Sequence, residues 1–160
     1  MNKISTCLWF DNQAEEAANF YVSIFKNSKI GNITRYGDEA AKVSGRPKGS
    51  VMTVTFQVNG HEFMALNGGA QFKFTEAVSF IVNCETQEEL DYFWDKLSEG
   101  GKEVECGWLK DRYGVSWQIV PTFLSELLKS SDPVKFQKVM KALLQMKKLD
   151  IKKLQEAYNN

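Results

Sequence analysis

Two stretches of the chain repeat the same order of apolar and polar positions at a constant spacing of 73 residues. The matched segments are 8–10 and 81–83, 15–16 and 88–89, and 20–21 and 93–94. In both copies an alternating apolar run passes through a polar turn into apolar residues at helical spacing. A second sequence similarity, between residues 59–66 and 113–120 at a spacing of 54, indicates that both copies end on a strand.

The first copy is predicted to hold a strand, a helix and then three more strands. The first strand covers residues 3–10, and Asn12 with Glu15 fits a capping box opening a helix over about 13–25. The stripe predicted to be buried on this helix is Ala17, Phe20, Tyr21, Ile24 and Phe25. The remaining strands are expected over 30–36, 51–58 and 62–67, with a long exposed loop over 37–50 and a hairpin turn at Asn59-Gly60.

The second copy is predicted to repeat this order over a shorter length. A strand over residues 77–84 leads into a helix that Thr86 and Glu89 cap and that ends near Ser98, before Gly100-Gly101. Short strands are expected near 103–109 and 115–120, joined by a turn that Asp111 and Arg112 brace.

The pattern changes to helix after Pro121. Three helices are predicted, one carrying Phe123, one behind the cap Asp132 and one behind the cap Asp150. Their apolar face, which covers the core or a dimer seam, contains Val139, Met140, Leu143 and Leu144. The expected organisation is one domain over 1–160, with a first unit over about 1–70, a second over about 75–121 and a helical tail over about 122–160.

The charge balance argues against polyanionic partners. Twenty basic residues balance twenty acidic ones, so the chain carries no net field to hold a nucleic acid or an anionic membrane surface. With 43% apolar residues, the chain can still bury a substantial core. We therefore expect neither a nucleic-acid partner nor a membrane partner.

The cysteines point to packing rather than catalysis. Cys7, Cys84 and Cys106 are odd in number and form no CxxC motif, and no signal peptide or long apolar run accompanies them. The chain has one histidine, His61, beside a turn glycine, so a nucleophilic thiol lacks an obvious base. The sequence predicts a reduced, cytoplasmic protein.

Several long motifs resemble a known family. They are Leu8-Trp9-Phe10-Asp11, Ala14-Glu15-Glu16-Ala17, Phe20-Tyr21, Ala65-Leu66-Asn67-Gly68-Gly69, Phe72-Lys73-Phe74, Cys106-Gly107-Trp108-Leu109-Lys110-Asp111-Arg112-Tyr113-Gly114 and Ser116-Trp117-Gln118. These motifs resemble the PhnB-like family, often labelled 3-demethylubiquinone-9 3-methyltransferase. That family lies in the glyoxalase, bleomycin-resistance and extradiol-dioxygenase superfamily, also called vicinal oxygen chelate proteins. The resemblance implies an α+β fold of two βαβββ repeats forming paired curved sheets with a shared cleft, plus a helical C-terminal extension.

Metal-dependent members of that superfamily take ligands from the first and last strands of each unit. The resemblance places these positions at Ile4, Met64, Ala77 and Gln118, of which three cannot bind a hard or borderline divalent ion. Moving the register by two residues offers only Thr6, Ser79, Leu66, Val120, Glu62 and Ser116, which would make a weak site. We predict no metal, no cofactor and no catalytic residue, and we expect His61 to be an exposed turn residue facing away from Glu62.

The family label implies methyl transfer, for which S-adenosylmethionine usually needs a glycine-rich turn between a strand and a helix. Asn67-Gly68-Gly69 and Glu99-Gly100-Gly101 lack that spacing, and the second follows a helix. A metal-independent protein that binds a small molecule is therefore the leading hypothesis. The alternative is an enzyme of the superfamily, with methyl transfer as the activity that the family label states.

The expected binding surface is a cleft lined by one face of each sheet. Its predicted lining is Thr6, Leu8, Phe10, Glu62, Met64, Leu66, Ser79, Ile81, Asn83, Ser116, Gln118 and Val120. The candidate ligand-binding residues among them are Thr6, Glu62, Met64, Ser79, Ser116 and Gln118. The opposite face, expected under the helices, holds Trp9, Phe63, Val78, Phe80, Val82, Trp117 and Ile119.

Such a concave, mostly apolar surface would take a small apolar or mixed molecule. Phe72-Lys73-Phe74 is interpreted as a gate or a linker between the units, and residues 108–112 as a charged rim or a hairpin brace. A third hypothesis is an interaction module whose cleft is packed shut by Phe10, Met64 and Leu66. The resemblance and the apolar tail also predict a homodimer.

Overall fold

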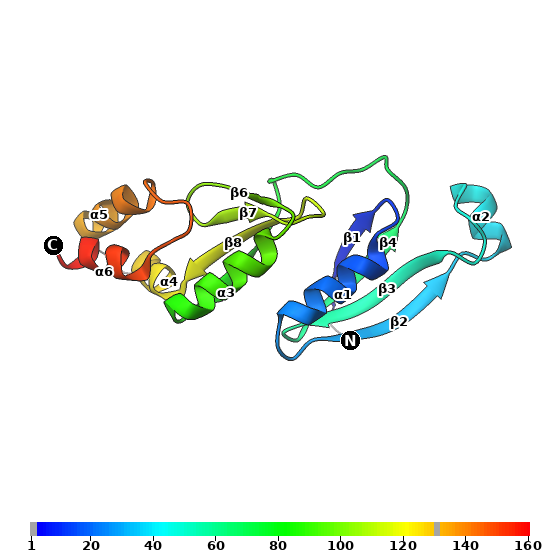
Figure 1. The fold of residues 1–160 in the computed structure, drawn as a ribbon, viewed down its shortest axis with the longest axis horizontal. Helices are drawn as coiled ribbons and strands as arrows, with labels where there is room; N and C mark the ends of the chain where they lie inside the picture. The colour runs from blue at the N-terminus through cyan, green and yellow to red at the C-terminus, as the bar shows by residue number, and fades with distance from the viewer. Residues whose placement is uncertain (1–2, 130–131) are drawn as a thin grey trace. The chain divides into compact units, whose positions relative to one another are not determined.

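The computed structural model describes residues 3–129 and 132–160. The chain divides into two compact units, Met1–Lys73 and Phe74–Asn160. Each unit contains one four-stranded sheet with a helix packed against it (Figure 1). The predicted α+β class and the two βαβββ repeats are confirmed.

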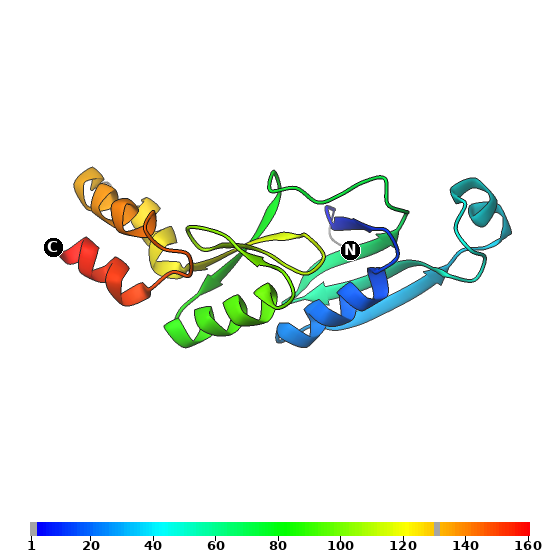
Figure 2. The same cartoon turned by 45° about the horizontal axis from the view of Figure 1, so that its top comes forward.

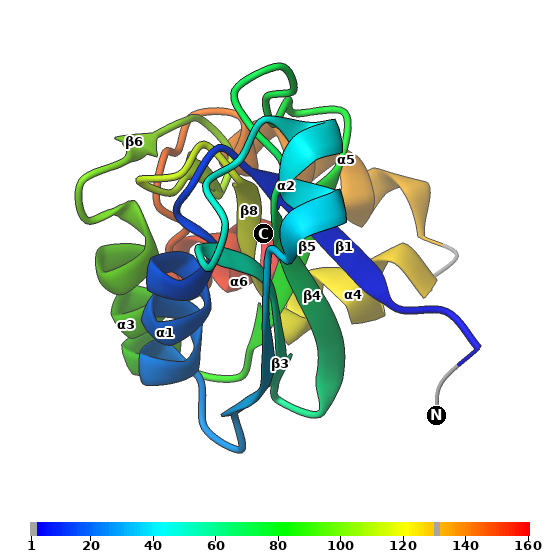
Figure 3. The ribbon, with the colours of Figure 1, turned by 90° about the vertical axis from the view of Figure 1, so that its right-hand side faces the viewer.

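The first unit follows the predicted order with one addition. Its elements are β1 (Thr6–Phe10), α1 (Ala14–Ile24), β2 (Lys29–Arg35), α2 (Asp38–Ser44), β3 (Val51–Val58) and β4 (His61–Asn67). The sheet order is β1-β4-β3-β2, and β1 runs parallel to its neighbour β4 (Figure 3). The predicted hairpin turn is confirmed, because Asn59 and Gly60 both adopt positive φ, at 47° and 80°.

The loop predicted over residues 37–50 contains a helix. Asp38 and Glu39 lie in the first turn of α2, and Gly45 ends it in the left-handed region at φ 70°. The helix buries no residue, and Val43 is 90% exposed. The prediction was right about the exposure of this segment and wrong about its backbone.

Asn67, the last residue of β4, makes hydrogen bonds to three other segments of the first unit. Its Oδ1 accepts a 2.8 Å hydrogen bond from the Ala14 amide, and its Nδ2 donates to the Val51 carbonyl at 3.1 Å. The Tyr36 hydroxyl donates to the Asn67 carbonyl at 2.6 Å. One buried side chain and its backbone thus join the start of α1, the start of β3 and the residue after β2.

This arrangement corrects the predicted capping box. The N-cap of α1 is Gln13, which makes no side-chain capping bond, and neither Asn12 nor Glu15 caps the helix. Asn67 supplies the missing acceptor from another strand. Of the predicted stripe, Ala17, Tyr21 and Ile24 are buried, whereas Phe20 and Phe25 are half-buried; Ala14 and Ala18 are the buried positions that the prediction missed.

The second unit repeats the design and adds the tail. Its elements are β5 (Ser79–Cys84), α3 (Gln87–Ser98), β6 (Lys102–Glu103), β7 (Trp108–Lys110), β8 (Ser116–Pro121), α4 (Thr122–Lys129), α5 (Pro133–Leu143) and α6 (Ile151–Asn159). The sheet order is β5-β8-β7-β6, with β5 parallel to β8. The run expected as one strand near 103–109 is broken, because Cys106 and Gly107 turn the chain with φ of 62° and 82°.

The predicted caps of the second unit are confirmed. The Thr86 hydroxyl accepts from the Glu89 amide at 3.2 Å, and the Glu89 carboxylate accepts from the Glu85 amide at 2.8 Å. Asp132 and Asp150 cap α5 and α6. Asp111 braces its hairpin by accepting from the amides of residues 113 and 115 and from the Trp117 indole.

The helical tail packs onto the second unit. The amides of Cys106 and Gly107 donate to the carbonyls of Met146 and Lys147, both at 2.7 Å. The helices α5 and α6 lie side by side (Figure 2). Val139 and Leu143 are buried as predicted, whereas Leu144 is exposed. Throughout residues 3–129 and 132–160, every helix is too short or too polar to cross a membrane.

We predict that Asn67→Ala lowers the free energy of unfolding by about 1–3 kcal/mol, since it leaves the Ala14 amide and the Val51 carbonyl without their partner. Urea denaturation of the purified protein measures this. Asn19→Ala is the matched control, because Asn19 is an exposed residue of α1 that bonds only within its own helix. Equal stabilities of the two variants would contradict the role given to Asn67.

We also predict a loss of stability above pH 9 that depends on Cys84. Burial, and secondarily the charge of Glu89, raises the pKa of the Cys84 thiol from 9.0 to about 12. A raised pKa contributes stability that is complete below pH 9 and is lost as the pH rises toward 12, because the unfolded chain releases the proton first. The expected loss between pH 7 and pH 10 is about 1.4 kcal/mol.

Denaturant titrations at several pH values measure this loss. The Cys84→Ala variant should show a shallower decline than wild type, and Cys106→Ala should decline like wild type. Parallel pH profiles for wild type and Cys84→Ala would refute the effect.

Candidate functional site

Each sheet has one face under a helix and one face pointing away from it. In the first unit Leu8, Phe10, Phe63 and Ala65 are buried on the α1 side. We call the other side the α1-distal face; it holds Cys7, Trp9, Thr53, Thr55, Gln57, Glu62, Met64 and Leu66. Neighbours on this face are set by the register, which pairs Cys7 with Met64 and Trp9 with Leu66.

The predicted face of β1 was wrong. Leu8 and Phe10 lie under α1 rather than beside Met64 and Leu66, and Trp9, expected under the helix, lies on the α1-distal face. Thr6 pairs with Phe63, and its Oγ1 lies 3.2 Å from His61 Nε2. Of the three candidate residues in this unit, Glu62 and Met64 therefore share a face and Thr6 does not. Phe10 also cannot close this face together with Met64 and Leu66.

The face of β1 was predicted wrongly because the two strand-to-helix connections differ in length by one residue. The ends of β1 and β5, Phe10 and Cys84, are 74 residues apart, whereas the starts of α1 and α3, Ala14 and Gln87, are 73 apart. The connection between strand and helix is thus one residue shorter in the second unit. A shift of one residue turns every side chain of a strand to the other face, so the constant spacing of 73 assigned β1 wrongly.

In the second unit the predicted face agrees with the register. We call the side away from α3 the α3-distal face; it holds Ser79, Ile81, Asn83, Trp108, Lys110, Ser116, Gln118 and Val120. Trp117 and Ile119 are buried on the α3 side, where Phe80 and Val82 accompany them. Val78, predicted to be under the helix, precedes β5 and is exposed.

Three predicted residues form a polar cluster on the α3-distal face. Gln118 Nε2 donates to Ser79 Oγ at 2.9 Å, and Ser116 pairs with Ser79 across the parallel strands. Ser116 is 1% exposed, and its hydroxyl finds no hydrogen-bond partner among the described residues. Since Ser79 accepts the Gln118 bond, its own proton remains available to a ligand, and a serine hydroxyl can also accept.

Lys110 lies next to this cluster, paired across the sheet with Ser116. Its ammonium forms an ion pair with Glu76, and the hydrogen bond from Lys110 lowers the pKa of that carboxyl. Of the predicted charged rim, only Lys110 belongs to this face, because Asp111 braces the hairpin and Arg112 bonds the Glu99 carbonyl at 3.3 Å. The polar cluster therefore lies beside a charge that already has a counter-ion.

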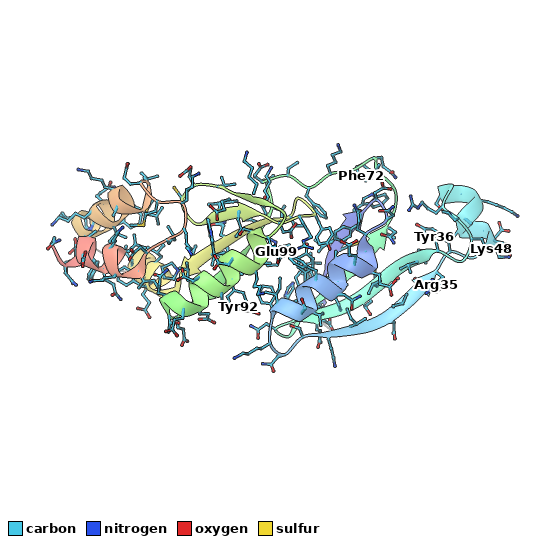
Figure 4. The ribbon with its side chains drawn as sticks, viewed as in Figure 1. Arg35, Tyr36, Lys48, Phe72, Tyr92 and Glu99 are labelled. Atoms are coloured by element: carbon cyan, nitrogen blue, oxygen red, sulfur yellow. The ribbon has the colours of Figure 1, made fainter. Side chains whose placement is uncertain are left out.

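The α1-distal face carries a fixed indole. Trp9 Nε1 donates to the Gly69 carbonyl at 2.8 Å, and Phe72 packs edge-on to the Trp9 ring with centroids 4.9 Å apart. A Cβ at Gly68 would lie 2.1 Å from the indole, so only glycine allows this approach. Figure 4 shows Phe72 on the segment that follows β4. We call residues 68–72 the 68–72 turn.

The donor set does not fit a metal ion. Ile4 precedes β1 and is 88% exposed, Ala77 precedes β5, Met64 pairs with Cys7, and Gln118 is bonded to Ser79. Among the residues that the structure describes, no group of three or more His, Cys, Asp or Glu side chains could hold a metal. Partial burial raises the pKa of the Cys7 thiol, which favours the protonated form. His61 is exposed and, as predicted, on the face opposite Glu62.

Nor do the strand-to-helix turns fit S-adenosylmethionine. The β1–α1 connection is Asp11-Asn12-Gln13 and the β5–α3 connection is Glu85-Thr86, neither with a glycine. Both helices carry two glutamates in their first turn, which disfavours an anionic group there.

Sequence reasoning missed Trp9 and Cys7 as residues of a candidate site, and it named Phe72 only as part of a gate or a linker. Cys7 and Trp9 are as apolar as Leu8 and Phe10, so alternation alone cannot tell which pair faces the helix. The available signal was the Gly68-Gly69 pair after a strand, which allows a close approach to a large ring.

Comparison with known proteins agrees with this geometry. Residues 2–120 match the family described as 3-demethylubiquinone-9 3-methyltransferase, and the helical tail lies outside the match. A search of curated protein sequences finds no significant match.

Solved structures show the same fold. A putative 3-demethylubiquinone-9 3-methyltransferase, PhnB protein, from Bacillus cereus is 40% identical over 75% of this chain and 99% of its own, with a TM-score of 0.66. A Pseudomonas aeruginosa protein is 21% identical over 75% of this chain and 96% of its own, with a TM-score of 0.58. Since the family match covers both repeats and the Bacillus cereus relative is matched over nearly its whole length, the chain belongs to the PhnB-like 3-demethylubiquinone-9 3-methyltransferase family.

Proposed function

We propose that this protein binds a small apolar or mixed molecule, without a metal, and that Ser79, Ser116 and Gln118 make its polar contact. The observation that carries the proposal is the Ser116 hydroxyl, which is buried and without a partner among the described residues. A buried hydroxyl without a hydrogen bond costs stability, so a position that keeps one favours a ligand that completes it. The adjacent Ser79–Gln118 pair offers both donors and acceptors to the same ligand group.

The surroundings favour a neutral polar group on that ligand. Lys110, the nearest cation by register, is paired with Glu76 and therefore attracts an anion only weakly. Ile81 and Val120 lie on the same face and supply apolar contact. In the first unit, the candidate residues Glu62 and Met64 offer a carboxylate and a thioether on the α1-distal face.

An enzyme of the superfamily, with methyl transfer as the family description states, is the alternative proposal. It is supported by the name of the Bacillus cereus relative. It is disfavoured by the absence of glycine from the β1–α1 and β5–α3 connections. Calorimetry with S-adenosylmethionine separates the alternatives, because saturable micromolar binding would favour the enzyme.

We predict that protein dialysed against EDTA still binds members of a small-molecule library, detected by shifts in melting temperature and by NMR. Gln118→Leu should weaken the hits about tenfold, which is the effect of losing one hydrogen bond. Gln137→Leu is the matched control, since Gln137 is an exposed residue of α5. Ser116→Ala should weaken the hits too, yet leave the free protein at least as stable, because it removes a hydroxyl without a partner.

The proposal would be wrong if no compound binds below about 1 mM, a threshold near 4 kcal/mol of binding free energy. It would also be wrong if Gln118→Leu and Ser116→Ala bind every hit as wild type does, or if all binding requires an added divalent ion.

We also propose that the chain is a cytoplasmic homodimer. Cys7, Cys84 and Cys106 are free thiols, as expected of a reducing compartment. On the tail, Val134 and Leu144 are exposed apolar residues that a second copy could cover.

Light scattering at tens of micromolar should therefore give a dimer mass. Leu144→Lys should shift the mass toward the monomer if the tail joins the interface. Val43→Lys, a matched change at an exposed valine of α2, should not. A monomer mass for wild type would exclude the dimer.

A further inference from the structure

The indole of Trp9 is held in one position. Its Nε1 is bonded to the Gly69 carbonyl, Gly68 lies against the ring, and Leu66 is its neighbour on β4. The side-chain Nε2 of Gln71 donates to the Gly68 carbonyl at 3.0 Å, which closes the 68–72 turn on itself. A side chain fixed in this way can contact a ligand without losing further rotamer freedom.

Phe72 and Trp9 form a pair of rings that we call the corner. The Phe72 ring stands at 77° to the indole with the centroids 4.9 Å apart, and Phe72 is 63% exposed. A large apolar side chain exposed to this degree on a short, closed turn gains little from the fold, whereas its position against Trp9 is well defined.

The side chains next to Trp9 on the strands are uncharged. Trp9 pairs with Leu66, and the next pair along the strands is Cys7 with Met64, which is itself exposed. Glu62, the carboxylate of the α1-distal face, pairs with Gln57 further along β4. The corner therefore offers two π-systems, and the neighbouring strand side chains add apolar or sulfur contacts without a charge.

From these observations we propose that Trp9 and Phe72 form a stacking site for a neutral, planar aromatic ring. This inference rests on the proposed small-molecule function and concerns the first unit alone. Aromatic rings prefer offset-stacked or edge-to-face contacts, and two rings at nearly a right angle let one flat ligand ring make both. A saturated ring of the same carbon skeleton is thicker and has no π-system, so it gains neither contact.

The test compares 2-naphthol with its saturated counterpart decahydro-2-naphthol, by calorimetry on the full chain. Wild type should bind 2-naphthol about tenfold more tightly, which corresponds to the energy of an aromatic pair. Trp9→Leu and Phe72→Leu should lower this preference to less than about twofold, while both alcohols still bind by apolar contact. Phe72→Leu is the safer variant for folding, because Phe72 is exposed.

Tyr92→Leu is the matched control. Tyr92 lies on α3 (Figure 4), is 42% exposed and packs edge-on to Phe93 with centroids 5.2 Å apart, so it has the same kind of contact elsewhere. This variant should keep the wild-type preference.

Equal affinity of wild type for the two alcohols would overturn the stacking site while leaving the proposed function standing. The same holds if neither alcohol binds although other library compounds do, or if Tyr92→Leu loses the preference as Phe72→Leu does. If no compound of any kind binds, the proposed function fails together with this inference.

Discussion

The hydrogen bonds of Asn67 are the constraint on which the first unit depends. A polar side chain in this position is buried only because its carbonyl oxygen and its amide nitrogen both find backbone partners, on Ala14 and Val51. The bond to the Ala14 amide fixes where α1 begins relative to β4. The face that α1 leaves uncovered holds Trp9 and Met64. A capping interaction thus joins the start of α1 to a strand more than fifty residues away.

The two repeats reach the same topology by different local means. The first helix takes its cap from a strand more than fifty residues away, whereas the second is capped by Thr86 and Glu89 beside it. The second helix also holds the tail, since the Gln87 side chain bonds the Leu149 carbonyl and the Ile151 amide. The strand-to-helix connection before α3, whose cap is local, is also one residue shorter than the one before α1. The repeats have accordingly diverged at their strand-to-helix turns while keeping the parallel pair of first and last strands.

Much of this architecture could be predicted from the sequence, because its signals are local. Asn59-Gly60, Thr86 with Glu89, Asp132 and Asp150 each act within a few residues, and all lie where predicted. The faces of β5 and β8 were also predictable, since Ser79 and Gln118 alternate with Phe80 and Trp117. The predictions that failed concerned features that depend on distant residues or on an ambiguous apolar pattern. The cap from Asn67 cannot be predicted from a short stretch of sequence, because Asn67 is far from α1 in the chain. The face on which each β1 residue lies cannot be predicted either, because Cys7 and Trp9 are as apolar as Leu8 and Phe10. The predicted register placed Ser79 and Gln118 on one face, as the structure does. It did not place Trp9 and Phe72 together.

The docking of the tail has a consequence for how this chain can vary. The family match ends at residue 120, yet Met146 and Lys147 bind the amides of Cys106 and Gly107, immediately before β7. Gly107 has no room for a side chain, because a Cβ would lie 2.9 Å from the Ile119 carbonyl and 3.0 Å from Leu149. β7 in turn carries Trp108 and Lys110 onto the α3-distal face. A homologue lacking the tail therefore needs water or another segment to satisfy the same two amides.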